Sequence, residues 1–225
     1  MNERPVHPFP YSDRSEAGRV LGAALRKYRG TPGLLVLGLP RGGVPVAAEV
    51  ATALEAALDV VVVRKVGHPR QAELAAGAVA EAAGESVAVW NDDVVRHWLD
   101  TEPASAQAEL DAVAAAERAE LLRRSENYRP RLPPQQVSGK TVLVVDDGLA
   151  TGATMRAALA AVRGLDPAWL VAAAPMSCGP ASLAAWPADD VVVPWDNSRL
   201  ASVGQAYRVF GQTSDAEVRK TLGLN

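Results

Sequence analysis

The segment from Thr141 to Thr154 joins two adjacent carboxylates to a loop of small and hydroxyl residues. The β-branched run 141–145 precedes Asp146 and Asp147, and a helix-forming run begins at Met155. A buried parallel strand would deliver both acids to its carboxyl edge, where open α/β sheets bind ligands. The loop would then present backbone N–H groups at a helix N-terminus, which favour a phosphate. The pattern indicates a ligand with both a diol and a phosphate, such as a phosphorylated ribose.

Asp146-Asp147-Gly148 on its own is also typical of an ordinary turn, because Asp-Gly is a common turn signal. The full order of apolar run, two acids, three spacers, Thr, Gly, small residue and Thr is far more specific. It resembles the phosphoribosyl-pyrophosphate (PRPP) motif of type I phosphoribosyltransferases at nearly every position. The resemblance implies a catalytic Asp147. It also implies PRPP-binding residues at Asp146, Asp147, Ala150, Thr151, Gly152, Ala153 and Thr154.

A second glycine-rich loop, residues 38–45, also follows an apolar run and precedes a helical pattern. Val44-Pro45 stands where a nucleotide-triphosphate loop requires Lys and Ser or Thr, and the glycine spacing does not match a dinucleotide fingerprint. An arginine flanked by glycines instead suits a pyrophosphate. The loop resembles the pyrophosphate loop of the same family, which implies that Arg41, Gly42 and Gly43 bind PRPP. The resemblance also implies a cis peptide at Pro40–Arg41 or Arg41–Gly42.

A basic segment, residues 64–71, follows the second apolar run and is predicted to be a mobile loop. A solvated basic loop without a binding role fits the residues equally well. Family members close a flexible loop over PRPP from about this place in the chain. The resemblance therefore implies that Arg64, Lys65 and His68 contact the departing pyrophosphate, with Lys65 catalytic. His68 is otherwise expected to be a surface histidine.

The chemistry implied by the resemblance is transfer of phosphoribosyl from PRPP to a nitrogen base. The transition state resembles an oxocarbenium ion, so catalysis depends on stabilising charge and excluding water. Asp146 and Asp147 would hold the ribose hydroxyls, and Mg²⁺ would be the cofactor, held largely by PRPP and water. No protein ligand of the metal is assigned. Ala150 stands where hypoxanthine-guanine enzymes have an Asp, which disfavours that specificity and leaves the acceptor base open.

The elements that must position these residues alternate between apolar strands and helical patterns. This rhythm predicts an α/β fold, a doubly wound and mostly parallel five-stranded sheet. Asp13 and Glu16 form a capping-box pattern for a helix through Tyr28. The runs 77–80 and 86–90 could pair as an antiparallel ribbon. The five strands are expected at residues 34–39, 58–63, 142–145, 170–174 and 191–193.

We expect a single domain over residues 1–225 that carries two additions. Residues 92–128 are predicted to be a helical insertion, with Pro103 opening its second helix and a proline-rich linker after it. Its charged stretch is most simply a solvated helix face, because interleaved glutamates weaken the alternative of a basic recognition helix. Residues 193–225 are the candidate hood and C-terminal helix. Its rings could stack on a base or simply pack in the core: Trp195, Tyr207 and Phe210.

The composition limits the classes of binding partner that the sequence predicts. The 225 residues are 48% hydrophobic with a formal net charge of −3, so no global basic field indicates nucleic acid or a membrane surface. The single Cys178 fits a reducing compartment, and no apolar run approaches the ~18 residues that span a bilayer. We therefore expect a cytoplasmic protein, and by resemblance a homodimer. The whole-chain pattern resembles a bacterial branch of predicted phosphoribosyltransferases of unsettled substrate.

Two other readings compete with a transferase. One is a non-catalytic regulator that senses PRPP or a nucleotide on the same fold. The acid pair and the loop cations favour the enzyme over this regulator. The other is a generic α/β phosphatase or receiver-like domain that uses the acid pair, but it leaves Arg41-Gly42-Gly43 without a role.

Overall fold

The computed structural model describes residues 10–82, 84–101, 105–128, 135–179 and 186–224. The helices in these ranges are α1 (Arg14–Ala24), α2 (Gly43–Leu54), α3 (Asp92–Thr101), α4 (Ala106–Tyr128), α5 (Ala153–Arg163) and α6 (Asp215–Thr221), with 3₁₀ turns η1 (Arg26–Tyr28) and η3 (Val203–Ala206). The strands are β1 (Leu35–Gly38), β2 (Ala57–His68), β3 (Gln71–Ala82), β4 (Glu85–Trp90), β5 (Thr141–Val145), β6 (Trp169–Ala173), β7 (Met176–Ser177), β8 (Asp190–Val192) and β9 (Trp195–Asp196). Among the described helices, none has the length and apolarity needed to cross a bilayer.

The central sheet has seven strands in the order β4-β3-β2-β1-β5-β6-β8. Its five strands from β2 to β8 are parallel, which confirms the expected α/β sheet. The antiparallel ribbon expected at residues 77–80 and 86–90 is also confirmed as β3 paired with β4. The ribbon joins the same sheet through β2. Sequence spacing alone could not show that it would extend this sheet.

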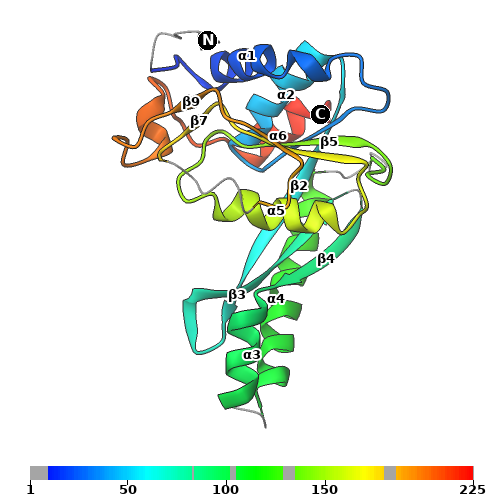
Figure 1. Cartoon of the computed structure of the whole chain (residues 1–225), viewed down its shortest axis with the longest axis vertical. Helices are drawn as coiled ribbons and strands as arrows, with labels where there is room; N and C mark the ends of the chain where they lie inside the picture. The colour runs from blue at the N-terminus through cyan, green and yellow to red at the C-terminus, as the bar shows by residue number, and fades with distance from the viewer. Residues whose placement is uncertain (1–9, 83, 102–104, 129–134, 180–185, 225) are drawn as a thin grey trace.

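Helices cover both faces of the parallel strands, as Figure 1 shows for α1 and α2 on one side and α5 on the other. Successive side chains of a strand point to opposite faces, so an unbroken apolar run supplies both layers. Val142 and Val144 face α5, whereas Leu143 and Val145 face the layer that α1 and α2 contribute. This two-sided burial explains why the strand sequences show no polar alternation.

Helix α1 begins as the capping pattern predicts, since the Asp13 side chain accepts a hydrogen bond of 2.9 Å from the Glu16 backbone N–H. It ends at Ala24, earlier than the expected Tyr28, and the 3₁₀ turn η1 follows at Arg26–Tyr28. Near the C-terminus, α6 begins with a capping box formed by Ser214 and Glu217. Between β8 and α6, β9 pairs with β7 in a separate two-stranded sheet.

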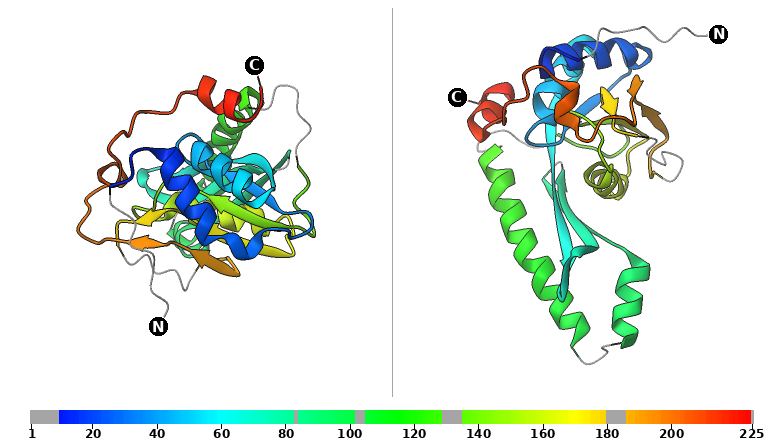
Figure 2. Two further views of the ribbon diagram at one scale, coloured as in Figure 1. Left: turned by 90° about the horizontal axis from the view of Figure 1, so that it is seen from above. Right: turned by 90° about the vertical axis from the view of Figure 1, so that its left-hand side faces the viewer.

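The ribbon and the helices α3 and α4 form an arm that projects from the body (Figures 1 and 2). The helices α3 and α4 lie within residues 92–128 as expected, and Pro103 lies outside the described residues. The mobile loop predicted at residues 64–71 is wrong, because β2 continues to His68 and β3 begins at Gln71. The physical reason is tertiary: Val62 and Val66 pack in the cluster that includes Leu121 of α4, so β2 gains a buried face along the arm.

Candidate functional site

Two loops leave the sheet side by side at the carboxyl ends of β1 and β5. The parallel register places Gly38 opposite Val145, and the Leu39 N–H donates to the Val145 carbonyl at 2.9 Å. The loop that contains Arg41 therefore starts beside Asp146. The Pro40–Arg41 peptide is cis, one of the two positions that the resemblance indicated.

Glycine is required where these loops touch. A Cβ added to Gly42 would lie 2.0 Å from Asp147 Oδ2, and one added to Gly43 would lie 2.7 Å from the Val145 carbonyl oxygen. Real Cβ atoms do not approach other atoms this closely, so a larger residue would displace the carboxylate or the strand end. The two glycines thus let the arginine loop pack directly against the acid pair.

The two carboxylates are half-buried next to each other, which alters their protonation. Burial, followed by the charge of Asp147, raises the pKa of Asp146 from about 3.8 to about 7. The Asp147 backbone N–H opposes this rise by donating to Asp146 Oδ1 at 2.9 Å. Burial also raises the pKa of Asp147, against the opposing effect of Arg14. The pair therefore gains or loses a proton near neutral pH.

Arg14, at the start of α1, holds Asp147. Its Nε and Nη2 lie 2.9 Å and 2.8 Å from Asp147 Oδ2, and the two side chains are 13% and 15% exposed. Its Nη1 donates to the Gly211 carbonyl at 2.7 Å, and its guanidinium carbon lies 4.0 Å from the centre of the Phe210 ring. One guanidinium thus links the N-terminal helix, the acid pair and the C-terminal segment.

Two of the three rings expected in the hood, Tyr207 and Phe210, lie near this carboxylate. The Tyr207 hydroxyl donates to the Asp147 backbone carbonyl, and the ring is buried in a cluster with Tyr11 and Met176. Burial, with the charge of Asp147, raises the pKa of Tyr207, so the hydroxyl remains a donor. Phe210 stacks on Tyr207 with ring centres 5.0 Å apart, yet it is 39% exposed. Of these two rings, Phe210 is the one available to a ligand.

The loop before α5 presents its small residues to solvent. Gly152 is the exception: it is buried in the left-handed region with φ of 71°, and a Cβ there would lie 2.6 Å from the Trp186 ring. Upstream, the Leu149 N–H donates to the Met176 carbonyl at 3.0 Å, and the Cys178 N–H donates to the Leu149 carbonyl at 2.7 Å. These bonds fix the loop on β7. Its exposed members are Ala150, Thr151, Ala153 and Thr154.

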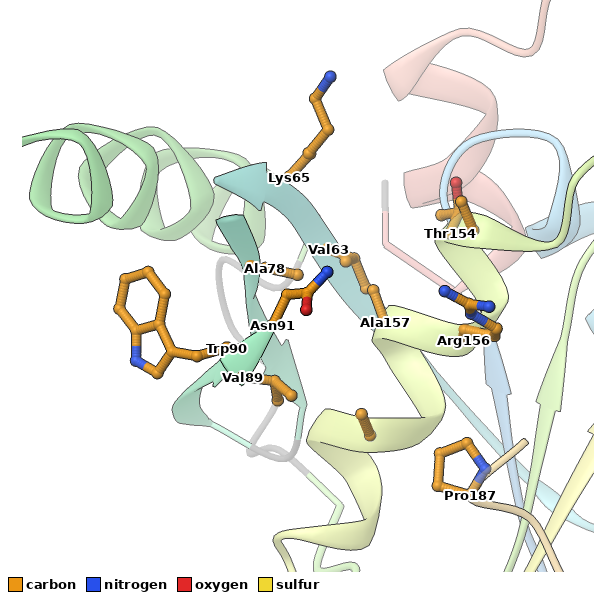
Figure 3. A pocket seen from close by; sticks show the side chains of 13 residues that line it. Val63, Lys65, Ala78, Val89, Trp90, Asn91, Thr154, Arg156, Ala157 and Pro187 are labelled. Carbon is orange, nitrogen blue, oxygen red and sulfur yellow. The ribbon is translucent and has the colours of Figure 1, made fainter. Parts of the chain in front are cut away.

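A cavity of about 540 Å³ separates the amino-terminal end of α5 from the ribbon. Figure 3 shows Lys65 on β2 across this cavity from Thr154 and Arg156 of α5, and Trp90 at its far end. Lys65 therefore lies on the same cavity as the candidate phosphate loop, as a residue of a strand and not of a loop.

Comparisons with known proteins identify the family of the chain. The family model described as phosphoribosyl transferase domain matches residues 16–204. The chain belongs to the phosphoribosyl transferase domain family. Two Mycobacterium tuberculosis proteins, both named "Putative phosphoribosyl transferase", are 45% identical over 212 residues, which are 92% of this chain and 45% of theirs. The chain thus spans about half the length of these curated relatives.

A solved structure shares the whole architecture. The crystal structure of TT1426 from Thermus thermophilus is 39% identical, covers 94% of this chain and 97% of its own, and superposes with a TM-score of 0.79. This phosphoribosyl transferase domain therefore has a relative of similar length and fold.

Two of the candidate residues in this transferase domain, Arg64 and His68, contact helices of the arm. Arg64 Nε and Nη2 both lie 2.6 Å from Glu117 Oε2 on α4. The His68 ring packs against Trp98 of α3, with ring centres 4.2 Å apart and ring planes tilted by 44°. Because side chains alternate along β2, Arg64 faces α4 while Lys65 faces the cavity. The structure thus places Lys65 on the same cavity as the candidate phosphate loop and separates both from Arg64 and His68.

Sequence reasoning missed Arg14 and the contact of Tyr207 with the acid pair. Arg14 lies 133 residues before Asp147 in an ordinary helix start, so no local pattern marks it. The aromatic residues near the C-terminus were noticed, but their hydrogen bond to this backbone depends on chain packing. In this transferase domain, the acid pair is held by residues from both ends of the chain.

The donor set fits a metal that arrives with its ligand. Among the described residues, no group of three or more His, Cys, Asp or Glu side chains could hold a metal ion. Asp146 and Asp147 nevertheless supply oxygen ligands of the kind that Mg²⁺ prefers, and Mg²⁺ is commonly bound by one or two carboxylates together with phosphates of the substrate. These two carboxylates therefore fit a Mg²⁺ ion that is bound together with substrate phosphates.

Proposed function

We propose that this protein transfers the phosphoribosyl group of PRPP to a nitrogen base and releases pyrophosphate, with Mg²⁺ as cofactor. The observation that carries the proposal is the direct packing of the arginine loop on the acid pair, with Gly42 against Asp147. A pyrophosphate site on the arginine loop and a diol site on the acid pair would then be adjacent, as the two ends of the C1–pyrophosphate bond require. The family membership supports the same activity.

Recognition would divide among three elements. Asp146 and Asp147 would accept hydrogen bonds from the ribose hydroxyls. Backbone N–H groups at residues 150–154 would bind the 5-phosphate with the hydroxyls of Thr151 and Thr154. Arg41 would bind the pyrophosphate with its planar set of donors.

The reaction breaks the bond between C1 and the pyrophosphate oxygen, and the electron pair leaves with pyrophosphate. A nitrogen of the acceptor base forms a bond to C1, and the proton of that nitrogen passes to solvent or to a proton acceptor. Positive charge develops on the ribose ring, so an ionised acid pair close to that ring would stabilise the transition state. Lys65 and Arg41 would neutralise part of the negative charge that develops on the leaving pyrophosphate. Mg²⁺, when bound, would neutralise part of the same charge.

The test is pyrophosphate release from PRPP and Mg²⁺ across a panel of purine, pyrimidine and pyridine bases. We expect turnover with one class of base, abolished in Asp147→Asn. Asp100→Asn, an exposed position on α3, is the matched control and should retain activity. Tight PRPP binding without turnover on any base would favour the regulator instead. Absence of PRPP binding with Mg²⁺ present would refute both.

Two further expectations accompany the proposal. A homodimer is predicted, to be measured by analytical ultracentrifugation. A cytoplasmic location is predicted, to be measured by fractionation of cells that express the protein. Neither one enters the argument for the reaction.

A further inference from the structure

A second cavity lies where the arm meets the arginine loop. It has a volume of about 220 Å³ and is bordered by Pro40 and Arg41 on one side and by the carboxyl-terminal part of α4 on the other. Figure 2 shows this end of α4 reaching α6, against which it packs. The helical insertion therefore returns to the body beside the loop to which we assign pyrophosphate.

The cavity is rich in positive charge. Arg41, Arg123 and Arg124 line it, and among the described lining residues Asp215 is the one carboxylate. Arg123 and Arg124 both bind Glu120, by two bonds of 2.7 and 2.9 Å and one of 2.8 Å, and Glu120 does not line the cavity. A guanidinium has more N–H donors than these bonds use, so both arginines have donors left for a second anion.

Asp215 is held in place from the side of α4. Its Oδ1 accepts from the Tyr128 hydroxyl at 3.0 Å, and its Oδ2 accepts from Asn127 Nδ2 at 3.3 Å. Arg41 Nη1 lies 3.9 Å from Asp215 Oδ1, which is beyond a good hydrogen bond. Arg41 is thus drawn towards the cavity by a weak contact that an incoming anion could replace.

The volume fits a small polyanion. A water molecule takes about 30 Å³ of liquid, so the cavity holds roughly seven waters, which is comparable to one pyrophosphate. An anion with several charged oxygens could contact guanidinium groups from both walls at once, and such charge-assisted bonds are the stronger ones. A nucleobase would find few apolar contacts here, because most of the accessible lining is polar.

We propose that Arg123 and Arg124 bind the pyrophosphate end of PRPP, so that the helical insertion completes the site begun by Arg41. The inference rests on the proposed function for the identity of the ligand. Its own content is that residues of the insertion, and not only the loops of the core, hold the leaving group.

The test compares two probes by calorimetry with Mg²⁺ present: inorganic pyrophosphate, and ribose 5-phosphate, which lacks the pyrophosphate. The variant is Arg123→Gln with Arg124→Gln, and the control is Arg118→Gln, an exposed arginine of α4 outside the cavity. Loss of charge-assisted bonds should weaken pyrophosphate and PRPP binding by about tenfold or more. Ribose 5-phosphate affinity and the control should stay within about twofold of the unaltered protein.

Each other outcome has a defined meaning. Unchanged pyrophosphate and PRPP affinity in the double variant would overturn the inference while leaving the proposed function intact. Equal loss for ribose 5-phosphate would show a general structural effect and would also overturn it. Pyrophosphate binding that depends on both arginines, in a protein that binds no PRPP, would refute the proposed function and keep the anion site.

Discussion

Replacing Arg14 by methionine should destabilise the protein through Asp147. Methionine keeps much of the apolar stem of Arg14 but removes the guanidinium, which contacts Asp147 Oδ2 at 2.8–2.9 Å and lies over the Phe210 ring. Breaking a buried ion pair from one side typically costs about 3–5 kcal/mol, because the remaining charge is left without a partner. Since both side chains retain some exposure, we expect a loss at the lower end, about 3 kcal/mol at pH 8.

The loss should depend on pH with a defined sign. Arg14 opposes the effect of burial on the pKa of Asp147, so this pKa should rise further in the variant. A carboxyl group whose pKa is higher in the folded state than in the unfolded state binds more protons when folded. Its folded state therefore loses stability as pH increases above the unfolded value, about 3.9. The deficit of the variant should be largest at pH 8 and should shrink towards pH 4.

Urea denaturation at pH 5, 6.5 and 8 measures this directly. Arg19→Met is the matched control, since Arg19 is exposed on the same helix and contacts only the Ser15 carbonyl at 3.4 Å among the bonds described. Adding Asp147→Asn to the Arg14→Met variant should recover most of the loss, because no unpaired charge remains. A loss below about 1 kcal/mol that does not change with pH would refute the reasoning.

Three further outcomes follow from the site. Gly42→Ala should weaken PRPP binding by at least about tenfold in calorimetry, because its Cβ would meet Asp147 Oδ2. The control Gly179→Ala, where a Cβ meets nothing within 4 Å, should bind PRPP normally. Equal effects of the two substitutions would contradict the packing argument. Tyr207→Phe should lower the free energy of unfolding by about 1–3 kcal/mol, since the Asp147 carbonyl loses its side-chain donor. Urea denaturation measures this, and a stability equal to that of the unaltered protein would show that the hydrogen bond contributes nothing. Turnover should rise with pH through about 7 as Asp146 ionises, and a profile that is flat from pH 6 to 8 would exclude a role for that ionisation.

Local signals predicted much of the site. The adjacent acids, the small-residue loop and the glycine-flanked arginine each follow an apolar strand, and parallel strands end at one edge of a sheet. That is why Arg41 and Asp147 could be placed together from the sequence. The loop assignment of residues 64–71 failed because a solvated loop and a strand supported by a distant helix have similar local composition. Only the tertiary structure shows the strand, because α4 supplies the buried partners of Val62 and Val66.

The sequence by itself determined the family, the parallel core and the residues that we propose bind a phosphorylated ribose, because these depend on short-range spacing. Tertiary structure alone decided which charges meet. Arg14 holds Asp147 across 133 residues, and Arg123 and Arg124 reach the loop of Arg41 because the arm folds back beside β2. Alternation along β2 then sends Lys65 to the cavity and Arg64 to Glu117. Such long-range pairings follow from how the elements pack, and no local spacing in the chain encodes them.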